Sequence, residues 1–389
     1  MFANRIINVP KSFIREILKV SADKSIISFA GGLPNRDLFP VENIQMATNR
    51  VFNTEGADVL QYNKSEGDPE LRAEISKRYK SIYSLDIPVK NILITNGSQQ
   101  GLDLLGKVFL NEGDSVIMEE PGYLGAIQAF GVYKADFIPV PVTEEGMDTA
   151  QLKSALLNKK PKLIYTVPTF QNPSGITYSN ENRKAVADIL KNRDLYLVED
   201  NPYAELRFEG EHKKSFKEFL PEKTILLGTI SKTIVPSFRL GWIVAPDEVM
   251  EKLLVAKQAS DLHTNYFTQR VVCTFLKDYS LDDHIKKINA LYSTQKQAMI
   301  EAIKNYFPEG IKYTNPEGGM FLWVTLPEGF NAMDLFNRAI EKKVAFVPGD
   351  PFYTNKTGVN TLRLNYTNSD EHAIDAGIRR LGECIREAL

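Results

Sequence analysis

Lys232 stands in a stretch whose residue types suit chemistry with a carbonyl compound. It lies between two apolar, β-type runs at 224–227 and 242–245. A buried ammonium is costly unless it is paired or loses its proton, and a neutral lysine amine forms imines with carbonyls. Hydroxyl and guanidinium groups suited to a phosphate surround it: Thr229, Ser231, Thr233 and Arg239. A surface loop with two ordinary basic residues is the alternative that this stretch alone leaves open.

Other polar residues also directly follow apolar runs. Gly97-Ser98-Gln99 follows the run 92–95 and opens a helical pattern, and a helix N-terminus of this kind favours a phosphate. The remaining residues of this type are Tyr123 after 116–118, Asn172 after 163–166, and Asp200 and Tyr203 after 195–198. Each has an ordinary alternative, namely a common glycine turn, a packed loop tyrosine, a loop amide or, for Asp200, an internal salt bridge.

Short apolar runs alternating with helical patterns must position these residues. The strand candidates are 92–95, 116–118, 137–140, 163–166, 195–198, 225–227 and 242–244. Near-continuous apolar strands with intervening helices predict an α/β fold with a mostly parallel, seven-stranded sheet covered on both faces. Such sheets bind ligands beyond the carboxyl ends of their strands, where the residues above are expected to meet.

The chain length of 389 residues predicts more than one domain. A helical pattern fills 261–306, and short strands (320–325, 344–347, 361–366) alternate with helices after 313. We therefore expect an N-terminal arm at 1–45, a large α/β domain at 46–285 and a smaller α/β domain at 286–389.

Composition and charge exclude several classes of protein. With 47 basic and 49 acidic residues the net charge is −2, which argues against a nucleic-acid surface. No apolar run is long enough to cross a membrane, and a signal-peptide core is missing. Two cysteines are too few for a disulfide framework and indicate a reducing, cytoplasmic location. The four scattered histidines predict no metal site.

Taken together, the residues at the predicted strand ends match the requirements of pyridoxal 5'-phosphate. That cofactor needs an anion site, a flat platform, a counter-ion for a protonated ring nitrogen, donors to its phenolic oxygen and an imine-forming lysine. The groups that follow successive strands of one predicted sheet are a phosphate-binding turn, a stacking aromatic ring, an amide, a carboxylate, a phenol, a lysine and an arginine.

From about Ser12 to its C-terminus the sequence resembles the fold-type I pyridoxal-phosphate aminotransferases of class I/II. Within them it is most similar to the 2-aminoadipate and kynurenine aminotransferases. The motifs that carry the resemblance are Ser28-Phe29-Ala30-Gly31-Gly32-Leu33-Pro34, Leu60-Gln61-Tyr62, Asn172-Pro173-Ser174-Gly175, Asp200-Asn201-Pro202-Tyr203, Ser231-Lys232 and Arg363-Leu364-Asn365-Tyr366. One departure is Asn63-Lys64, where relatives often have a serine-proline pair.

The resemblance implies a role for each matching residue. Lys232 would bind the cofactor covalently and shuttle a proton, Asp200 would hold the ring nitrogen protonated, and Tyr203 and Asn172 would bond the phenolic oxygen. Tyr123 would stack on the ring. The phosphate would be held by Ser98, Gln99, Thr229, Ser231 and Arg239, with Tyr62 reaching in from a partner subunit.

The resemblance also implies substrate contacts. Arg363 would grip the α-carboxylate together with Asn172, the alternative being a surface charge on a small-domain strand. The helix with Ser12 and Arg15 would lie over the site, and Gly32 would line the pocket. Arg15 would meet a second substrate carboxylate, unless it is an ordinary solvated arginine.

These implications lead to a homodimeric aminotransferase with shared active sites. It would act on an amino acid and a 2-oxo acid, with 2-oxoglutarate as the general acceptor, over a broad or 2-aminoadipate and aromatic substrate range. A lyase or decarboxylase using the same cofactor is the first alternative, because fold does not fix the reaction. A ligand-sensing regulator is a weaker one, because such proteins begin with a winged helix-turn-helix and here the Ser12 segment starts almost at once.

Overall fold

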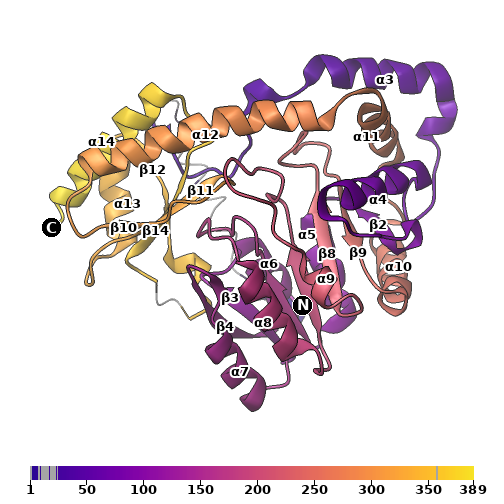
Figure 1. Ribbon diagram of the computed structural model, residues 1–389, viewed down its shortest axis with the longest axis horizontal. Helices are drawn as coiled ribbons and strands as arrows, with labels where there is room; N and C mark the ends of the chain where they lie inside the picture. Colours follow the sequence, from indigo (N-terminus) through magenta and orange to yellow (C-terminus); the bar gives the residue numbers. More distant parts are fainter. Residues whose placement is uncertain (1, 8, 10–16, 18–22, 24, 356–357) are drawn as a thin grey trace.

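The computed structural model describes residues 2–7, 9, 17, 23, 25–355 and 358–389. Its centre is an eight-stranded sheet with the order β2-β9-β8-β7-β6-β3-β4-β5 (Figure 1). The strands are β2 (Ile92–Thr95), β3 (Ser115–Glu120), β4 (Asp136–Thr143), β5 (Gly146–Met147), β6 (Leu163–Thr166), β7 (Tyr196–Asp200), β8 (Thr224–Thr229) and β9 (Gly241–Val244).

The sheet is mostly parallel, as predicted, but it has one strand more than the seven expected. β8, β7, β6, β3 and β4 pair in parallel, whereas β9 runs antiparallel to both β2 and β8. The extra strand, β5, folds back antiparallel on the end of β4 and pairs Val142 with Met147. Two residues are too few to show the period-two pattern by which strands are recognised in a sequence.

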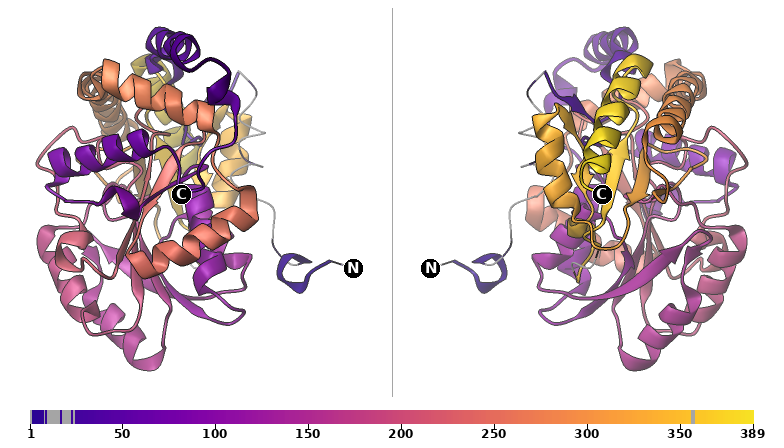
Figure 2. Two further views of the ribbon diagram at one scale, coloured as in Figure 1. Left: turned by 90° about the vertical axis from the view of Figure 1, so that its right-hand side faces the viewer. Right: turned by 90° about the vertical axis from the view of Figure 1, so that its left-hand side faces the viewer.

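Helices cover both faces of this sheet (Figures 1 and 2), so alternate residues of each strand enter different cores. The helices of this part are α3 (Val41–Glu55), α4 (Pro69–Tyr83), α5 (Ser98–Phe109), α6 (Leu124–Gly131), α7 (Thr149–Asn158), α8 (Asn180–Leu190), α9 (Phe216–Phe219), α10 (Asp247–Asp261) and α11 (Tyr266–Asp278). In β8, Ile225 and Leu227 pack with α5 and α10, whereas Leu226 packs with α4 and α11. Short 3-10 turns lie elsewhere in the chain, at Arg36–Leu38, Gly56–Leu60, Val89–Asn91 and Asp350–Phe352.

Side-chain caps fix where many of these helices begin. Asp68 accepts a hydrogen bond from the Leu71 amide at the start of α4, and Ser280 accepts one from the Asp283 amide at the start of α12. Such caps satisfy N–H groups that the first helical turn leaves free. α12 (Leu281–Tyr306) has 26 residues and therefore spans about 39 Å, which carries it from the large sheet to the small one (Figure 1).

A second, antiparallel sheet with the order β10-β11-β14-β13 forms the smaller part. Its strands and helices are β10 (Lys312–Tyr313), β11 (Phe321–Thr325), β13 (Val347–Pro348), β14 (Thr361–Asn365), α13 (Ala332–Glu341) and α14 (Glu371–Arg386). The predicted strand 344–347 is divided, because β12 (Val344–Ala345) pairs instead with β1 (Ile27–Ser28). The β1 segment of the predicted arm therefore lies with the smaller part, and the two boundaries between the three predicted segments remain predictions.

At the N-terminus, α1 (Asn4–Ile7) projects away from the body of the molecule (Figure 2), and none of its residues is buried. Most of the predicted helix around Ser12 and Arg15 lies outside the described residues. Among the helices of the described part of the chain, none has both the length and the apolar character needed to cross a membrane.

Candidate active site at the strand ends

The carboxyl ends of the parallel strands bring the predicted residues to one edge of the large sheet. Asp200 is the last residue of β7, and Thr229 is the last residue of β8. Lys232 lies three residues beyond β8, in the turn that leads to β9. Asn172 follows β6, and Ser98 begins α5 just after β2. The proximity expected from strand order is therefore present in the structure.

The Lys232 amine lies in a partly buried, cationic environment. Its Nζ donates a hydrogen bond of 2.7 Å to the carbonyl oxygen of Gly32, 200 positions away. Burial, reinforced by the positive charges of Arg363 and Arg239, lowers the pKa of Lys232 to about 8. This pKa leaves a sizeable neutral, nucleophilic fraction near neutral pH, which an ordinary surface lysine lacks. The surface-loop alternative is therefore wrong.

Asp200 is a buried carboxylate with one oxygen unused. Its side chain accepts a bond of 2.8 Å from the Tyr165 hydroxyl through Oδ2, whereas Oδ1 is buried without a partner. Burial raises the pKa of Asp200 to about 7. Within the described residues no basic side chain forms an ion pair with it, so the internal salt bridge considered for Asp200 is not present there. The free oxygen suits a cationic N–H group.

Asn172 joins two of the predicted residues. Its Nδ2 donates to the Tyr203 hydroxyl at 3.2 Å, and its Oδ1 accepts from Arg363 at 2.8 Å. Tyr203 lies edge-on to Phe321, and burial raises the pKa of its hydroxyl. The phenol is therefore a neutral donor, held at a fixed distance from the amide.

Arg363 points inward from β14 and is 1% exposed, so it is not the surface charge considered as an alternative. It donates to the carbonyl oxygen of Ala30 at 2.9 Å, and its guanidinium lies 4.2 Å from the ring centroid of Phe321. Its Nε is buried without a partner, and burial lowers its pKa to about 10. A buried cation with a free N–H and no carboxylate partner is suited to an anionic ligand.

Groups that suit a phosphate surround the start of α5. Gly97 has a φ of +77°, and a Cβ there would lie 2.6 Å from a guanidinium nitrogen of Arg239. The Ser98 hydroxyl is buried without a partner. Thr229 donates to the Ser231 hydroxyl at 2.9 Å on the other side of the turn. A glycine turn, a helix N-terminus, hydroxyls and a guanidinium together form an anion-binding set.

Two further predicted residues flank this set. Tyr123 packs over Gly125, where a Cβ would lie 2.5 Å from its ring, and burial raises its pKa to about 12. Gln99 is exposed and donates through Nε2 to the Gly125 carbonyl oxygen at 2.9 Å. The Gln99 side chain therefore binds the backbone beside Tyr123. If Gln99 contacts the phosphate, the contact is expected from its backbone N–H.

Not every predicted residue is brought to the site by this chain alone. The Tyr62 side chain is 78% exposed and contacts the His263 ring at 5.8 Å between centroids. Ser12 and Arg15 lie outside the described residues. Gly32 is present at the site. Its carbonyl oxygen accepts a hydrogen bond from Lys232, and its backbone lies next to the Phe321 ring.

The sequence did not reveal Tyr165 or Phe321. Tyr165 lies inside β6 and is completely buried, so in the sequence it is part of an apolar run. The available signal was its hydroxyl, because a buried phenol generally finds a polar partner. Phe321 opens β11, about 120 residues after Asp200, and only the fold brings its ring against Arg363 and Tyr203.

The unused polar atoms of the site fit pyridoxal 5'-phosphate. The orphaned Oδ1 of Asp200 suits a protonated ring nitrogen, and the Ser98 hydroxyl and the Gly97 turn suit the phosphate. Tyr203 and Asn172 offer an O–H and an N–H to a phenolic oxygen, beside the Lys232 amine. No part of this donor set conflicts with that cofactor.

Comparison with known proteins agrees with this fit. Residues 24–381 match the family model described as aminotransferase class I and II. The chain is 42% identical to aromatic-amino-acid aminotransferase 1 of Thermococcus litoralis, covering 100% of this chain and 94% of that protein. It also matches, with a TM-score of 0.96 and 42% identity over 100% of this chain and 98% of the other, a kynurenine aminotransferase of Pyrococcus horikoshii solved in complex with PMP, KYN as substrates and KYA as products.

A third match is the α-aminoadipate aminotransferase of Thermus thermophilus, solved with N-(5'-phosphopyridoxyl)-L-leucine. Here the TM-score is 0.93 at 40% identity, covering 99% of this chain and 97% of the other. The three names span aromatic, kynurenine and 2-aminoadipate substrates.

Proposed function

The chain belongs to the class I and II aminotransferases, and from the geometry of its site we propose how its own residues carry out that activity. It is a pyridoxal-phosphate-dependent enzyme that moves an amino group between an amino acid and a 2-oxo acid. The residue roles, the substrate range and the assembly given below are our proposals. The observation that carries the roles is the alignment of Lys232, Asp200 and Arg363 around one set of unused polar atoms.

Lys232 is assigned both the covalent hold on the cofactor and the proton transfer. When bound, pyridoxal phosphate supplies a carbonyl carbon that accepts an amine and a protonated ring that withdraws electrons from the substrate's α carbon. The Lys232 amine, with its pKa lowered to about 8 by burial and neighbouring arginines, is able to take the α proton near neutral pH. The same Nζ returns that proton later in the cycle.

Asp200, Tyr203 and Asn172 are assigned to the cofactor ring. The Asp200 carboxylate keeps a proton on the ring nitrogen through its free Oδ1, and the resulting positive charge lowers the raised pKa of the carboxyl in return. The Tyr203 hydroxyl and the Asn172 amide, 3.2 Å apart, donate to the phenolic oxygen. Tyr123 provides the stacking face, and Ser98, Gln99, Thr229, Ser231 and Arg239 hold the phosphate.

Arg363 is assigned to the substrate's α-carboxylate. Asn172 and the Ala30 carbonyl fix its two terminal nitrogens, and Phe321 supports the plane of the guanidinium. The guanidinium is thereby held so that it can donate two parallel hydrogen bonds to a carboxylate. A lysine cannot provide this pair of bonds. Gly32 lines the pocket with its backbone alone, since a Cβ there would lie 3.2 Å from the Phe321 ring.

The products of the reaction test the activity. Incubation of the purified protein with an amino donor and 2-oxoglutarate should yield the matching oxo acid and glutamate in equal amounts. Release of CO₂, or of an alkene, in place of the oxo acid would mean that the protein is a lyase or decarboxylase and would contradict the proposal.

The substrate range is proposed to be broad and to include aromatic amino acids and 2-aminoadipate, with 2-oxoglutarate as acceptor. The similar proteins named above support this range through their own substrates. A screen of the common amino acids plus 2-aminoadipate and kynurenine, each against 2-oxoglutarate, ranks the donors. A single accepted donor would contradict a broad range.

Arg15 is proposed to read the side-chain carboxylate of acidic substrates, with Ser12 on the same helix. A charge-assisted hydrogen bond contributes roughly 1.5–3 kcal/mol, or about one to two decades in kcat/KM. Arg15→Ala should lose that much toward 2-aminoadipate and glutamate and change little toward leucine or phenylalanine. Half-reactions must be measured singly, since 2-oxoglutarate is itself an acidic substrate. Equal loss for leucine and 2-aminoadipate would show that Arg15 only supports the helix over the site.

Tyr165 is proposed to position Asp200. Its hydroxyl lowers the pKa of that carboxyl, so Tyr165→Phe should raise it and weaken the hold on the ring proton. We expect roughly a tenfold loss in kcat, from a hydrogen bond of about 1.5 kcal/mol. The pH at which the visible absorbance of the bound cofactor titrates should also shift.

A matched control is Tyr178→Phe, because Tyr178 also gives a buried hydroxyl to a carboxylate, Glu119, away from Asp200. Tyr178→Phe should cost stability but leave the titration of the cofactor unchanged. Identical titrations for wild type and Tyr165→Phe would show that Tyr165 is only a packing residue.

The enzyme is proposed to be a homodimer in which Tyr62 completes the partner's phosphate site. Large apolar side chains on and after α3 are exposed on the isolated chain, including Met46 (52%), Phe52 (43%) and Leu60 (67%). Exposed apolar groups gathered next to one another mark an association surface. We place the protein in the cytoplasm, since Cys273 and Cys384 are both buried and unpaired.

Tyr62→Phe should weaken cofactor binding in the dimer by about tenfold, the value of one hydrogen bond to a charged group. Mixing Tyr62→Phe with Lys232→Ala chains should restore one intact site per mixed dimer, which activity and cofactor titration both detect. A fully active monomer at nanomolar concentration would contradict the shared site.

A further inference from the structure

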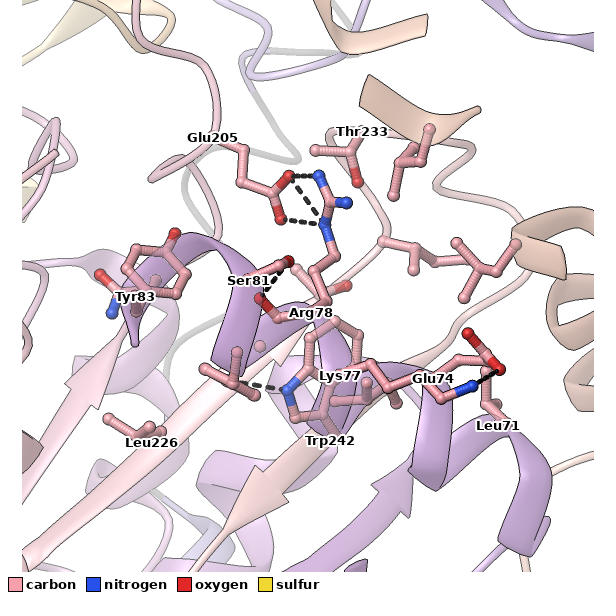
Figure 3. A pocket seen from close by; sticks show the side chains of 18 of the residues that line it. Leu71, Glu74, Lys77, Arg78, Ser81, Tyr83, Glu205, Leu226, Thr233 and Trp242 are labelled. Atoms are coloured by element: carbon pink, nitrogen blue, oxygen red, sulfur yellow. Dashed lines mark hydrogen bonds and ion pairs between the residues drawn. The ribbon is translucent and has the colours of Figure 1, made fainter. Parts of the chain in front are cut away.

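A cavity of about 350 Å³ lies between α4 and the sheet (Figure 3). Its floor is the sheet, at Gly228 in β8 and Trp242 in β9, and α4 covers it with Ile75 and Tyr79. The junction of α11 and α12 closes one end, at Tyr279. Of the residues assigned above, Thr229 is the one among those that line this cavity.

The charged groups around the cavity are already paired with one another, two cations with three carboxylates. Arg78 binds both carboxylate oxygens of Glu205 and also pairs with Asp282 at 3.0 Å. Lys77 pairs with Glu74 at 2.8 Å (Figure 3). A charged ligand would have to compete with these pairs, so the cavity does not favour the amino acids and oxo acids that the enzyme converts.

Neutral hydrogen-bonding groups remain unused at the same place. The Tyr79 hydroxyl accepts from the Trp242 ring N–H at 2.9 Å, while its own proton has no acceptor among the described residues. Asn201 lines the cavity, and its Oδ1 is buried without a partner in that same part of the chain. Burial raises the pKa of Tyr79, so its hydroxyl stays a donor. The wall thus offers one unused donor, the Tyr79 hydroxyl, whereas Asn201 Oδ1 is closed off from the cavity by its burial.

The walls are aromatic and flat. Tyr79, Tyr83, Trp242 and Tyr279 contribute rings, and Leu226 and Leu240 add aliphatic surface. Pockets of a few hundred Å³ that are mainly apolar, with a small number of polar groups, are the usual sites of small organic ligands. Rings also favour stacking or edge contacts with another aromatic group.

We propose that this cavity binds a neutral, planar aromatic heterocycle of one or two rings that carries a ring-nitrogen acceptor. The ring nitrogen would accept a hydrogen bond from the Tyr79 hydroxyl, and the rings would pack against the aromatic walls. The site is separate from the substrate pocket, but it touches both active-site loops. Asn201 stands between Asp200 and Tyr203, and Thr233 follows Lys232, so an occupant acts on the loops that carry the catalytic groups.

Benzimidazole is a suitable probe, because it is planar, neutral at about pH 8 and carries a ring-nitrogen acceptor. Calorimetric titration of the cofactor-loaded enzyme should show one saturable site per chain. The chain has two tryptophans, so Trp323→Phe leaves Trp242 as the reporter, and its fluorescence should change along the same binding curve. The inhibition pattern against the amino donor should not be competitive.

Variants of α4 locate the site. Ile75→Phe places extra volume in the cavity and should weaken benzimidazole binding at least tenfold. The matched control is Ile82→Phe, the same substitution on the same helix at a residue that does not line the cavity, and it should bind as wild type does. Tyr79→Phe removes one hydrogen bond and should weaken binding roughly 2- to 12-fold.

The cofactor spectrum and melting temperature of each variant show whether it is folded. If Ile75→Phe does not fold, the benzimidazole affinities of Tyr79→Phe and Ile82→Phe are compared instead, and only Tyr79→Phe should bind more weakly than wild type. Three results would overturn the proposal: no saturable heat or Trp242 signal at millimolar benzimidazole, competition with the amino donor, or equal weakening by Ile82→Phe.

Discussion

Lys232→Ala is expected to bind the cofactor and to lose turnover by at least about a thousandfold. The substitution removes the covalent hold and the proton-transferring amine together, and general base catalysis alone contributes about 10²- to 10⁴-fold. The groups around Gly97 that are proposed to bind the phosphate stay in place, and so does the Asp200 carboxylate. Affinity for the cofactor should therefore fall much less than kcat. Rapid-quench measurement of one half-reaction, together with cofactor titration, checks both parts.

Lys296→Met is the matched control, because Lys296 is also a buried lysine, but its amine is bound by Glu209 and by the Pro316 carbonyl oxygen. It should cost stability and leave the half-reaction rate close to wild type. A Lys232→Ala enzyme with more than a tenth of wild-type kcat would mean that another group moves the proton.

Asp200→Asn is expected to lower kcat by about a hundredfold to a thousandfold, the usual effect of removing one electrostatic group that acts in the transition state. An amide cannot keep the ring nitrogen protonated. Glu119→Gln is the control: Glu119 is equally buried at the end of β3, but it accepts from Thr166, Gln171, Tyr178 and the Val167 amide. Near-normal kcat in Asp200→Asn would make Asp200 a structural residue.

The same substitution has a second expected effect in the cofactor-free protein. Burial raises the folded-state pKa of Asp200 from 3.8 to about 7, so its ionisation opposes folding. The penalty is absent below about pH 4, grows between pH 4 and 7, and is constant above, reaching about 4 kcal/mol at 1.36 kcal/mol per unit. Cofactor-free Asp200→Asn should thus be more stable than wild type at pH 8, and the two should converge near pH 4. A pH-independent difference between the two unfolding free energies would contradict the raised pKa.

The sequence predicts the large sheet well, because both of its faces are covered. Strands such as β6 and β8 are then short, continuous apolar runs, and their limits are visible within a residue or two. The residues after these runs are found for the same reason, since the carboxyl ends of parallel strands share an edge. What could not be predicted there is β5, which has only two residues.

Contacts between distant segments are the other part that the sequence does not reveal. The hydrogen bond from Lys232 to the Gly32 carbonyl oxygen joins residues 200 positions apart, and the one from Arg363 to the Ala30 carbonyl oxygen joins residues 333 positions apart. The run 344–347 divides between two sheets, because Val344 pairs with the distant Ile27 of β1 whereas Val347 pairs with the nearby Arg363 of β14. The role proposed for Tyr62 would lie across a subunit interface, which contacts within one chain do not describe.

Borohydride reduction followed by peptide mass mapping tests the central claim most directly. The purified enzyme should be yellow, and reduction should fix the cofactor on a lysine of the peptide that contains Lys232. The Lys232→Ala enzyme, treated in the same way, should carry no fixed cofactor. Label on any other lysine of the wild-type enzyme would contradict the account, because the amine beside Gly32, Asp200 and Arg363 would then not be the one that holds the cofactor.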